Sequence, residues 1–210
     1  MMFRFLHLLI VLPALLFTHL AMAGTAPKQT ILFFGDSLSA AYGIPKEQGW
    51  VNLVAQRLKD KQLPYEVANA SVSGETTAGG LSRLPAALKQ FKPSIVVLEL
   101  GANDGLRGLP LDAMKNNLEK IIQASKQANA QVVLLGMLIP PNYGPKYTNG
   151  FKAAFLDLSE KYKTLFIPFF LDGISGHSDL VLEDGLHPNV TAQRKILENV
   201  WPTLKPLLRK

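Results

Sequence analysis

The sequence has 210 residues, no cysteine and a formal net charge of +6, and 48% of its residues are hydrophobic. The lack of cysteine excludes disulfides, a thiol nucleophile and a zinc site built on thiolates. The basic residues are scattered, with no run longer than two. This distribution predicts a solvated surface rather than a nucleic-acid interface, for which a basic stripe or a known motif would be expected.

The first residues have the pattern of a secretory signal peptide. Arg4 precedes an apolar run from Phe5 to Leu20, and Ala21-Met22-Ala23 is a small-x-small cleavage pattern. The run is shorter than the about 20 clean apolar residues that a spanning helix needs, which favours cleavage over a retained anchor. We therefore expect a signal peptide over 1–23 and one domain over 24–210. The mature protein is expected to be periplasmic or secreted, monomeric and without stable membrane insertion.

Short apolar runs rich in β-branched residues alternate with longer amphipathic patterns in the rest of the chain. The runs predict strands over 30–34, 65–69, 94–100, 131–138 and 165–167, and the amphipathic patterns predict helices over 50–60, 81–91, 111–129, 147–162 and 190–208. This alternation predicts an α/β fold with three layers, in which helices cover both faces of a parallel sheet.

Polar or glycine-rich segments follow the predicted strands. They are 35–37, 69–74, 101–104, 139–143 and, in the long loop after the fifth strand, 184–187. Functional sites in open parallel sheets form beyond the carboxyl ends of the strands. We therefore expect these five segments to meet at one edge of the sheet and to form one site there.

Three residues in these segments could carry out serine hydrolysis. Ser37 lies in a tight turn directly after an apolar run, where its hydroxyl can stand clear of the backbone as a nucleophile. His187 can act as a general base near neutral pH, and Asp184, three residues earlier, can fix its tautomer. Two alternatives remain open: Ser37 as an ordinary turn serine, and His177 as the base.

The tetrahedral intermediate of acyl transfer also needs hydrogen-bond donors for its oxyanion. The Ser37 amide, the Gly74 amide and the Asn103 side chain are candidates, although Gly74 and Asn103 are also typical turn residues. A metal site built from Asp36, Asp104, Asp184 and His187 is an alternative, but their spacing matches no ligand motif. The Gly-x-Ser-x-Gly elbow of α/β-hydrolases and the Gly-x-Gly-x-x-Gly dinucleotide motif after the first strand are both absent.

These segments resemble, in order, the four sequence blocks of the SGNH (GDSL) hydrolase superfamily. The matching residues are Gly35-Asp36-Ser37-Leu38, Gly74, Gly101-Ala102-Asn103-Asp104 and Asp184-x-x-His187. The resemblance implies a flavodoxin-like sheet of five strands, a catalytic triad of Ser37, Asp184 and His187, and no cofactor or metal. It also implies an oxyanion hole formed by Ser37, Gly74 and Asn103, and an acyl-enzyme intermediate.

The substrates implied by the resemblance are small acyl esters and thioesters, with lysophospholipids among them. Apolar residues predicted at the same edge would line the acyl site, namely Leu106, Leu109, Ile139, Pro141 and Tyr143. Such a lining discriminates poorly between acyl lengths, so we expect broad tolerance of chain length. A carbohydrate acetyl-esterase of the same fold and an inactive lipid-binding protein remain as alternatives.

Overall fold

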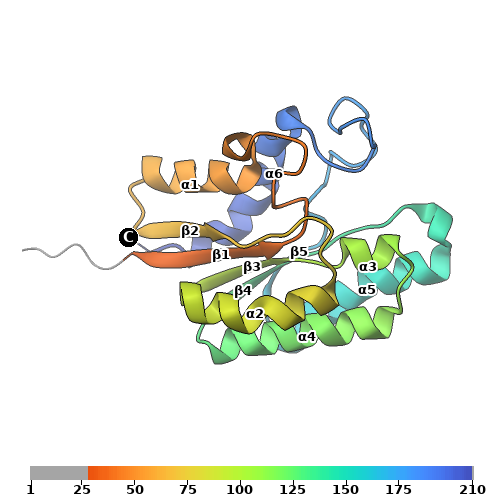
Figure 1. Ribbon diagram of the computed structural model, residues 1–210, viewed down its shortest axis with the longest axis horizontal. Coiled ribbons are helices and arrows are strands. Elements are labelled where there is room, and N and C mark those ends of the chain that lie inside the picture. The colour runs from red at the N-terminus through yellow and green to blue at the C-terminus, as the bar shows by residue number, and fades with distance from the viewer. Residues whose placement is uncertain (1–27, 210) are drawn as a thin grey trace, which may run out of the picture.

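A five-stranded parallel sheet with the order β2-β1-β3-β4-β5 forms the centre of the molecule (Figure 1). The computed structural model describes residues 28–209, so the predicted signal peptide lies outside the described part of the chain. The strands are β1 (Gln29–Gly35), β2 (Tyr65–Asn69), β3 (Ile95–Glu99), β4 (Gln131–Leu135) and β5 (Leu165–Ile167). The predicted α/β fold and its parallel five-stranded sheet are confirmed.

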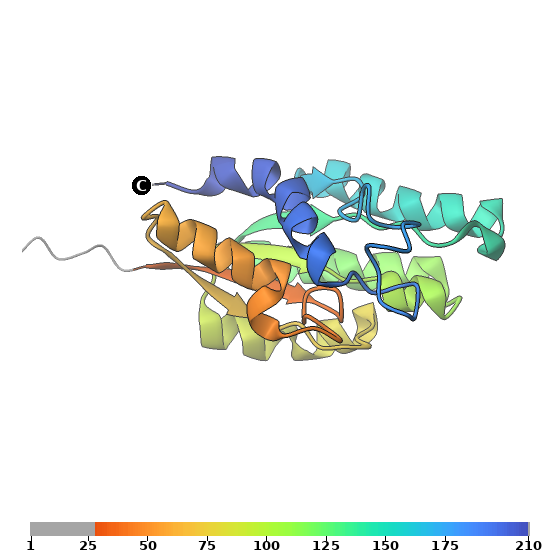
Figure 2. The ribbon, with the colours of Figure 1, turned by 90° about the horizontal axis from the view of Figure 1, so that it is seen from above.

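Helices cover both faces of this sheet, which gives the three predicted layers. Figures 1 and 2 show α1 (Trp50–Asp60) and α6 (Val190–Leu204) packed together over one face. The other face is covered by α2 (Thr77–Phe91), α4 (Leu111–Gln127) and α5 (Pro145–Tyr162). The central strands β1 and β3 are therefore buried on both sides, which explains why their sequences are continuous apolar runs rather than alternating ones.

Two helices begin earlier than their sequence patterns predict: α5 begins at Pro145 rather than at 147, and α2 differs more. The expected start was residue 81, but α2 begins at Thr77 and includes Gly79 and Gly80. The side chain of Thr76 caps the helix by accepting a hydrogen bond from the Gly79 amide at 3.3 Å. A Cβ on Gly80 would lie 2.4 Å from Leu100 Cδ1, so this glycine allows the helix to pack closely on the core. The glycine pair is thus part of the helix.

Other boundaries and some short elements also differ from the prediction. Strand β4 ends at Leu135 rather than at 138, α4 ends at Gln127 rather than at 129, and α6 ends at Leu204 rather than at 208. The segment after β3, expected as a loop, forms the short helix α3 (Ala102–Leu106). Three 3-10 turns were not predicted: η1 (Lys46–Gln48), η2 (Pro141–Tyr143) and η3 (Lys205–Leu207), which contains Pro206.

Gln193 joins the start of α1 to α6 and to the loop that directly precedes α6. Its side chain is buried in α6, and its Oε1 accepts a hydrogen bond from the Trp50 amide at the start of α1 at 3.0 Å. Its Nε2 donates to the carbonyl oxygens of Pro188 and Asn189, each at 3.1 Å. Gln193 therefore ties the loop that carries His187 to the helix pair on this face of the sheet.

We expect Gln193→Met to lower the free energy of unfolding by about 1–3 kcal/mol, because it nearly preserves volume but leaves the buried Trp50 amide without a partner. Urea unfolding monitored by circular dichroism would measure the change. Arg194→Met, at the next and exposed position of the helix, is the matched control and should change stability little. Equal stability of the two variants would contradict the role of Gln193.

Candidate active site

Ser37 and His187 are 150 residues apart in sequence but are in direct contact at the carboxyl edge of the sheet. The Ser37 Oγ lies 2.9 Å from His187 Nε2, and His187 Nδ1 lies 2.6 Å from Asp184 Oδ2. Ser37 belongs to the turn that follows β1 and is only 9% exposed. The histidine belongs to the long loop before α6. The three side chains thus form a continuous chain of hydrogen bonds.

Local backbone contacts hold the Asp184–His187 turn in this shape. Asp184 Oδ1 accepts hydrogen bonds from the His187 amide at 3.0 Å and from the Leu186 amide at 2.9 Å. These bonds, the His187 amide first, lower the pKa of the Asp184 carboxyl to about 2. Asp184 is therefore ionised at neutral pH and can accept a hydrogen bond from a proton carried on Nδ1 of His187. This leaves Nε2 as an acceptor for the Ser37 hydroxyl proton.

The second histidine, His177, does not occupy this position. It is exposed in the turn after β5, where its backbone amide bonds to the Ile174 carbonyl oxygen at 3.1 Å. The side chain of Tyr42 instead packs against His187, with ring centroids 4.4 Å apart. The sequence analysis did not identify Tyr42 as a partner of His187, because only the folded turn after β1 brings the two rings together.

The Asn103 side chain lies beside the turn that contains Ser37. Its Nδ2 donates a hydrogen bond to Asp36 Oδ2 at 3.1 Å, while Asp36 Oδ1 accepts from the Leu38 amide at 3.0 Å. An amide nitrogen carries two hydrogens, so the second N–H of Asn103 is left for another acceptor. Asp36 thereby connects the position of this amide to the Ser37 turn.

Gly74 lies in the loop between β2 and α2 with a φ of +77°, a left-handed conformation that favours glycine. Its carbonyl oxygen accepts a hydrogen bond from Arg107 Nη2, just after α3, at 3.0 Å. Asn103 and Arg107 therefore connect the same short helix to Asp36 on one side and to the Gly74 loop on the other.

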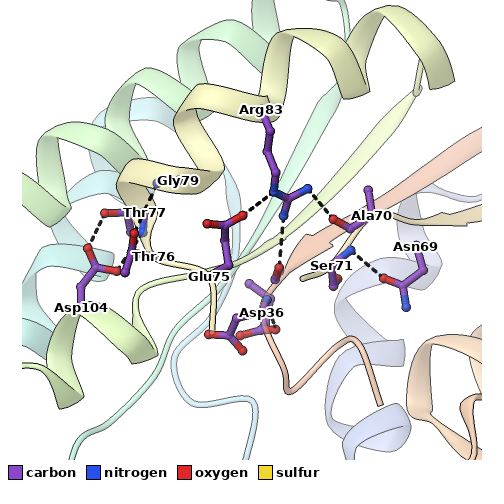
Figure 3. A network of polar contacts seen from close by, with 12 residues as sticks. Asp36, Asn69, Ala70, Ser71, Glu75, Thr76, Thr77, Gly79, Arg83 and Asp104 are labelled. Atoms are coloured by element: carbon purple, nitrogen blue, oxygen red, sulfur yellow. Dashed lines mark hydrogen bonds and ion pairs between the residues drawn. The ribbon is translucent and has the colours of Figure 1, made fainter. Parts of the chain in front are cut away.

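Two further groups hold this loop (Figure 3). Asp104 accepts hydrogen bonds from the Thr77 amide at 2.8 Å and the Thr77 hydroxyl at 2.6 Å, which fixes the loop's end at the start of α2. Arg83 binds Glu75 and also donates to the carbonyl oxygens of Ala70 and Gly35. The loop therefore has little freedom to move away from Ser37.

The acidic residues considered for a metal site form hydrogen bonds within the protein. Asp36 bonds Asn103 and the Leu38 amide, Asp104 bonds Thr77, and Asp184 bonds His187. Within residues 28–209, no three His, Asp or Glu side chains are grouped in a way that could hold a metal ion. Each of these carboxylates is instead engaged by protein donors.

The predicted acyl-site residues fall into two groups. Leu109 is 37% exposed, Leu106 is half-buried, and the Tyr143 hydroxyl donates to the Leu106 carbonyl oxygen at 2.7 Å, so these residues lie together. Pro141 is exposed in η2, whereas Ile139 is buried in the core beside Gly105. Next to Tyr143, a groove of about 480 Å³ is bordered by the stacked ring of Tyr147.

Sequence reasoning missed Glu99, the last residue of β3. Its side chain is fully buried behind the Ser37 turn, and its Oε2 accepts hydrogen bonds from the Ser39 hydroxyl at 2.7 Å and the Asp36 amide at 3.3 Å. A signal was present, since Glu99 is the single charged residue in the apolar run 94–100. A carboxyl at the carboxyl end of a buried strand is rare unless it has a partner.

The family model for GDSL-like lipases/acylhydrolases matches residues 33–195 of the chain. The esterase TesA of Pseudomonas aeruginosa is 50% identical over 183 residues, which cover 87% of this chain and 91% of the relative. The thioesterase 1/protease 1/lysophospholipase L1 of Escherichia coli K12 is 38% identical over 193 residues, covering 92% and 91%.

Solved structures agree with this relationship. A crystal structure of TesA superposes with a TM-score of 0.84 at 50% identity and covers 86% of this chain and 100% of the solved one. The psychrotrophic esterase EstA from Pseudoalteromonas sp., in a structure inhibited by monoethylphosphonate, gives a TM-score of 0.82 at 44% identity, with 86% and 98% covered. Sequence and fold together show that the chain belongs to the GDSL-like lipase/acylhydrolase family, as its motifs suggested.

Proposed function

We propose that this protein is a serine hydrolase that cleaves acyl esters and thioesters through an acyl-enzyme on Ser37. The observation that carries the proposal is the hydrogen-bonded chain from Ser37 Oγ through the His187 ring to Asp184, with distances of 2.9 and 2.6 Å. The relatives named esterase, and thioesterase 1/protease 1/lysophospholipase L1, support the same chemistry.

In the proposed acylation step, Ser37 Oγ attacks the carbonyl carbon of the substrate while His187 Nε2 accepts its proton. Asp184 keeps the proton on Nδ1 and stabilises the imidazolium that forms. His187 then returns the proton to the leaving alcohol or thiol, and the acyl group stays on Ser37. A water molecule attacks this acyl-enzyme in the second half, with His187 acting again as the base.

The negative charge that develops on the carbonyl oxygen needs donors fixed in advance. We assign this role to the amides of Ser37 and Gly74 and to the free N–H of Asn103. One such donor typically contributes about 10²–10³ in turnover, provided that it is already oriented. The hydrogen bonds that Asn103 donates to Asp36 and that Arg107 donates to the Gly74 carbonyl oxygen supply that orientation.

An acyl chain is the substrate part that best fits the surroundings of Ser37. Leu109 and Leu186 are exposed apolar residues of loops at this edge. Tyr147, which borders the groove beside Tyr143, donates a hydrogen bond to the Leu109 carbonyl oxygen. Such apolar surfaces discriminate little between acyl chains that differ by one methylene. We therefore propose that the enzyme accepts a range of acyl lengths and that lysophospholipids are among its substrates.

We further propose that residues 1–23 are a signal peptide and that the mature enzyme acts outside the cytoplasm as a monomer. The sequence of that segment supports the proposal, with a cation, an apolar run and a small-x-small site. Among the described residues, no helix is long and apolar enough to cross a membrane.

Hydrolysis of p-nitrophenyl esters from acetyl to palmitoyl should be measured for the mature protein and for Ser37→Ala. We expect activity on medium and long chains and a loss of turnover of about 10⁶-fold in Ser37→Ala, because members of a triad act as a unit. Activity restricted to the acetyl ester would instead indicate an acetyl-esterase. Fatty-acid binding without turnover in either protein would indicate a lipid-binding protein.

His187 and His177, the two histidines within residues 28–209, provide an internal control for the assignment of the base. We expect His187→Ala to lose turnover about as severely as Ser37→Ala, whereas His177→Ala should keep the wild-type kcat, since its ring lies away from Ser37. Steady-state kinetics with one medium-chain ester would measure both variants. A loss of turnover in His177→Ala together with an active His187→Ala would reverse the assignment.

A further inference from the structure

The carboxyl of Glu99 has an environment that does not suit a negative charge. Its residue is 1% exposed, its Oε2 has two hydrogen-bond donors, and its Oε1 is buried with no partner among the described residues. An ionised carboxylate needs several donors or a cation to offset its loss of water. One oxygen of Glu99 has no donor, and one of the two hydrogen bonds to the other oxygen, from the Asp36 amide, is long at 3.3 Å. Glu99 therefore has too few donors to stabilise a negative charge.

The charged groups around Glu99 are engaged elsewhere. The guanidinium of Arg83 on α2 binds Glu75 and two carbonyl oxygens. On α3, Asp104 is held by Thr77, and the His187 ring is held by Ser37 and Asp184. The remaining neighbour is Asp36. Its negative charge disfavours a second charge on Glu99, and, beside the larger effect of burial, the contact between the two carboxyls lowers the pKa of Asp36 and raises that of Glu99.

The two buried carboxyls differ in their donors. Each oxygen of Asp36 accepts one hydrogen bond, from the Leu38 amide and from Asn103, whereas Glu99 leaves one oxygen bare. Burial raises the pKa of Asp36 to about 6, and burial together with the charge of Asp36 raises the pKa of Glu99 well above its usual value. Above pH 6, therefore, Asp36 carries the single negative charge of the pair and Glu99 is the protonated partner.

We propose that Glu99 is a neutral carboxylic acid in the working enzyme and acts as a positioning residue for the Ser37 turn and the Asn103 amide. Its hydrogen bonds to the Asp36 amide and the Ser39 hydroxyl hold the turn on both sides of Ser37. Its neutrality leaves the charge on Asp36, which holds Asn103 toward the oxyanion site. This role rests on the proposed function of Ser37 and Asn103.

Gly35 makes room for this arrangement. A Cβ at this position would lie 2.5 Å from Glu99 Oε2 and 3.0 Å from Ser39 Oγ, too close for either atom to keep its place. The parallel register that pairs Gly35 with Glu99 brings the two residues side by side at the end of their strands. Every residue from Gly35 to Ser39 thus either serves the buried pair or is the proposed nucleophile itself.

Proton linkage tests the neutral state without using catalysis. Above pH 6, Glu99 keeps its proton in the folded protein but loses it on unfolding, because its usual value is 4.5. A raised folded pKa gives stability that is present at low pH and is lost as the pH rises through that folded value. The unfolding equilibrium constant of the wild type, divided by that of Glu99→Gln, should therefore rise with pH above about 4.5, by up to about tenfold per pH unit for as long as Glu99 keeps its proton in the folded protein.

Glu99→Gln is the matched variant, because glutamine copies the shape and neutrality of the protonated acid while both proteins retain Asp36. Urea unfolding at several pH values measures the ratio. A ratio that does not change with pH would mean that Glu99 is ionised and would overturn the proposal. Absence of esterase activity in the wild type would instead contradict the proposed function, so the two failures can be told apart.

Kinetics test the positioning role. We expect Glu99→Gln to keep kcat near that of the wild type and Glu99→Leu to lose on the order of 10²-fold in kcat with KM little changed. Ser39→Ala removes one hydrogen-bond partner of Glu99 and leaves the acid in place, so it should lower kcat less than Glu99→Leu does. It serves as the test of the positioning role if Glu99→Leu does not fold. A loss in Glu99→Gln as large as that in Glu99→Leu would overturn the positioning role.

Discussion

The pairing of β1 with β3 is the constraint on which the site depends. Its parallel register sets Gly35 beside Glu99 at the carboxyl ends of the two central strands. The turn that follows Gly35 then lies against the start of α3, where Asp36 meets Asn103 at 3.1 Å. A shift of register by one residue would turn the Glu99 side chain to the other face and separate these groups. The order of the sheet thus determines the geometry around Ser37.

The second half of the site comes from the opposite end of the chain and is held by different means. The loop that carries Asp184 and His187 has little regular structure, with one isolated bridge between Val181 and Pro188. Two residues secure the end of this loop. Asn189 caps α6 by accepting a hydrogen bond from the Ala192 amide, and Gln193 donates a hydrogen bond to the Pro188 carbonyl oxygen. Helix α6 packs on α1, so His187 is fixed relative to Ser37 through the core.

Much of this could be predicted from the sequence, because apolar periodicity and the rule for parallel sheets follow from local patterns. The five strands were found, and the expected meeting of Ser37, Asp184 and His187 is matched by the contacts of these side chains. The start of α2 was misjudged, because the bond from the Thr77 amide to Asp104 that supports it is a tertiary contact, and the local cap by Thr76 was overlooked. The roles of Tyr42 and Glu99 depend on which side chains face each other, and periodicity carries no information on that.

Formation of a covalent bond on Ser37 is the central claim, and labelling tests it directly. The folded protein should be treated with an activated phosphonate ester, digested, and analysed by mass spectrometry to locate the adduct. A hydroxyl activated by His187 reacts far faster than an ordinary serine, so the label is expected on Ser37 alone and should be absent in His187→Ala. Labelling that is spread over several serines, or that persists in His187→Ala, would contradict the account.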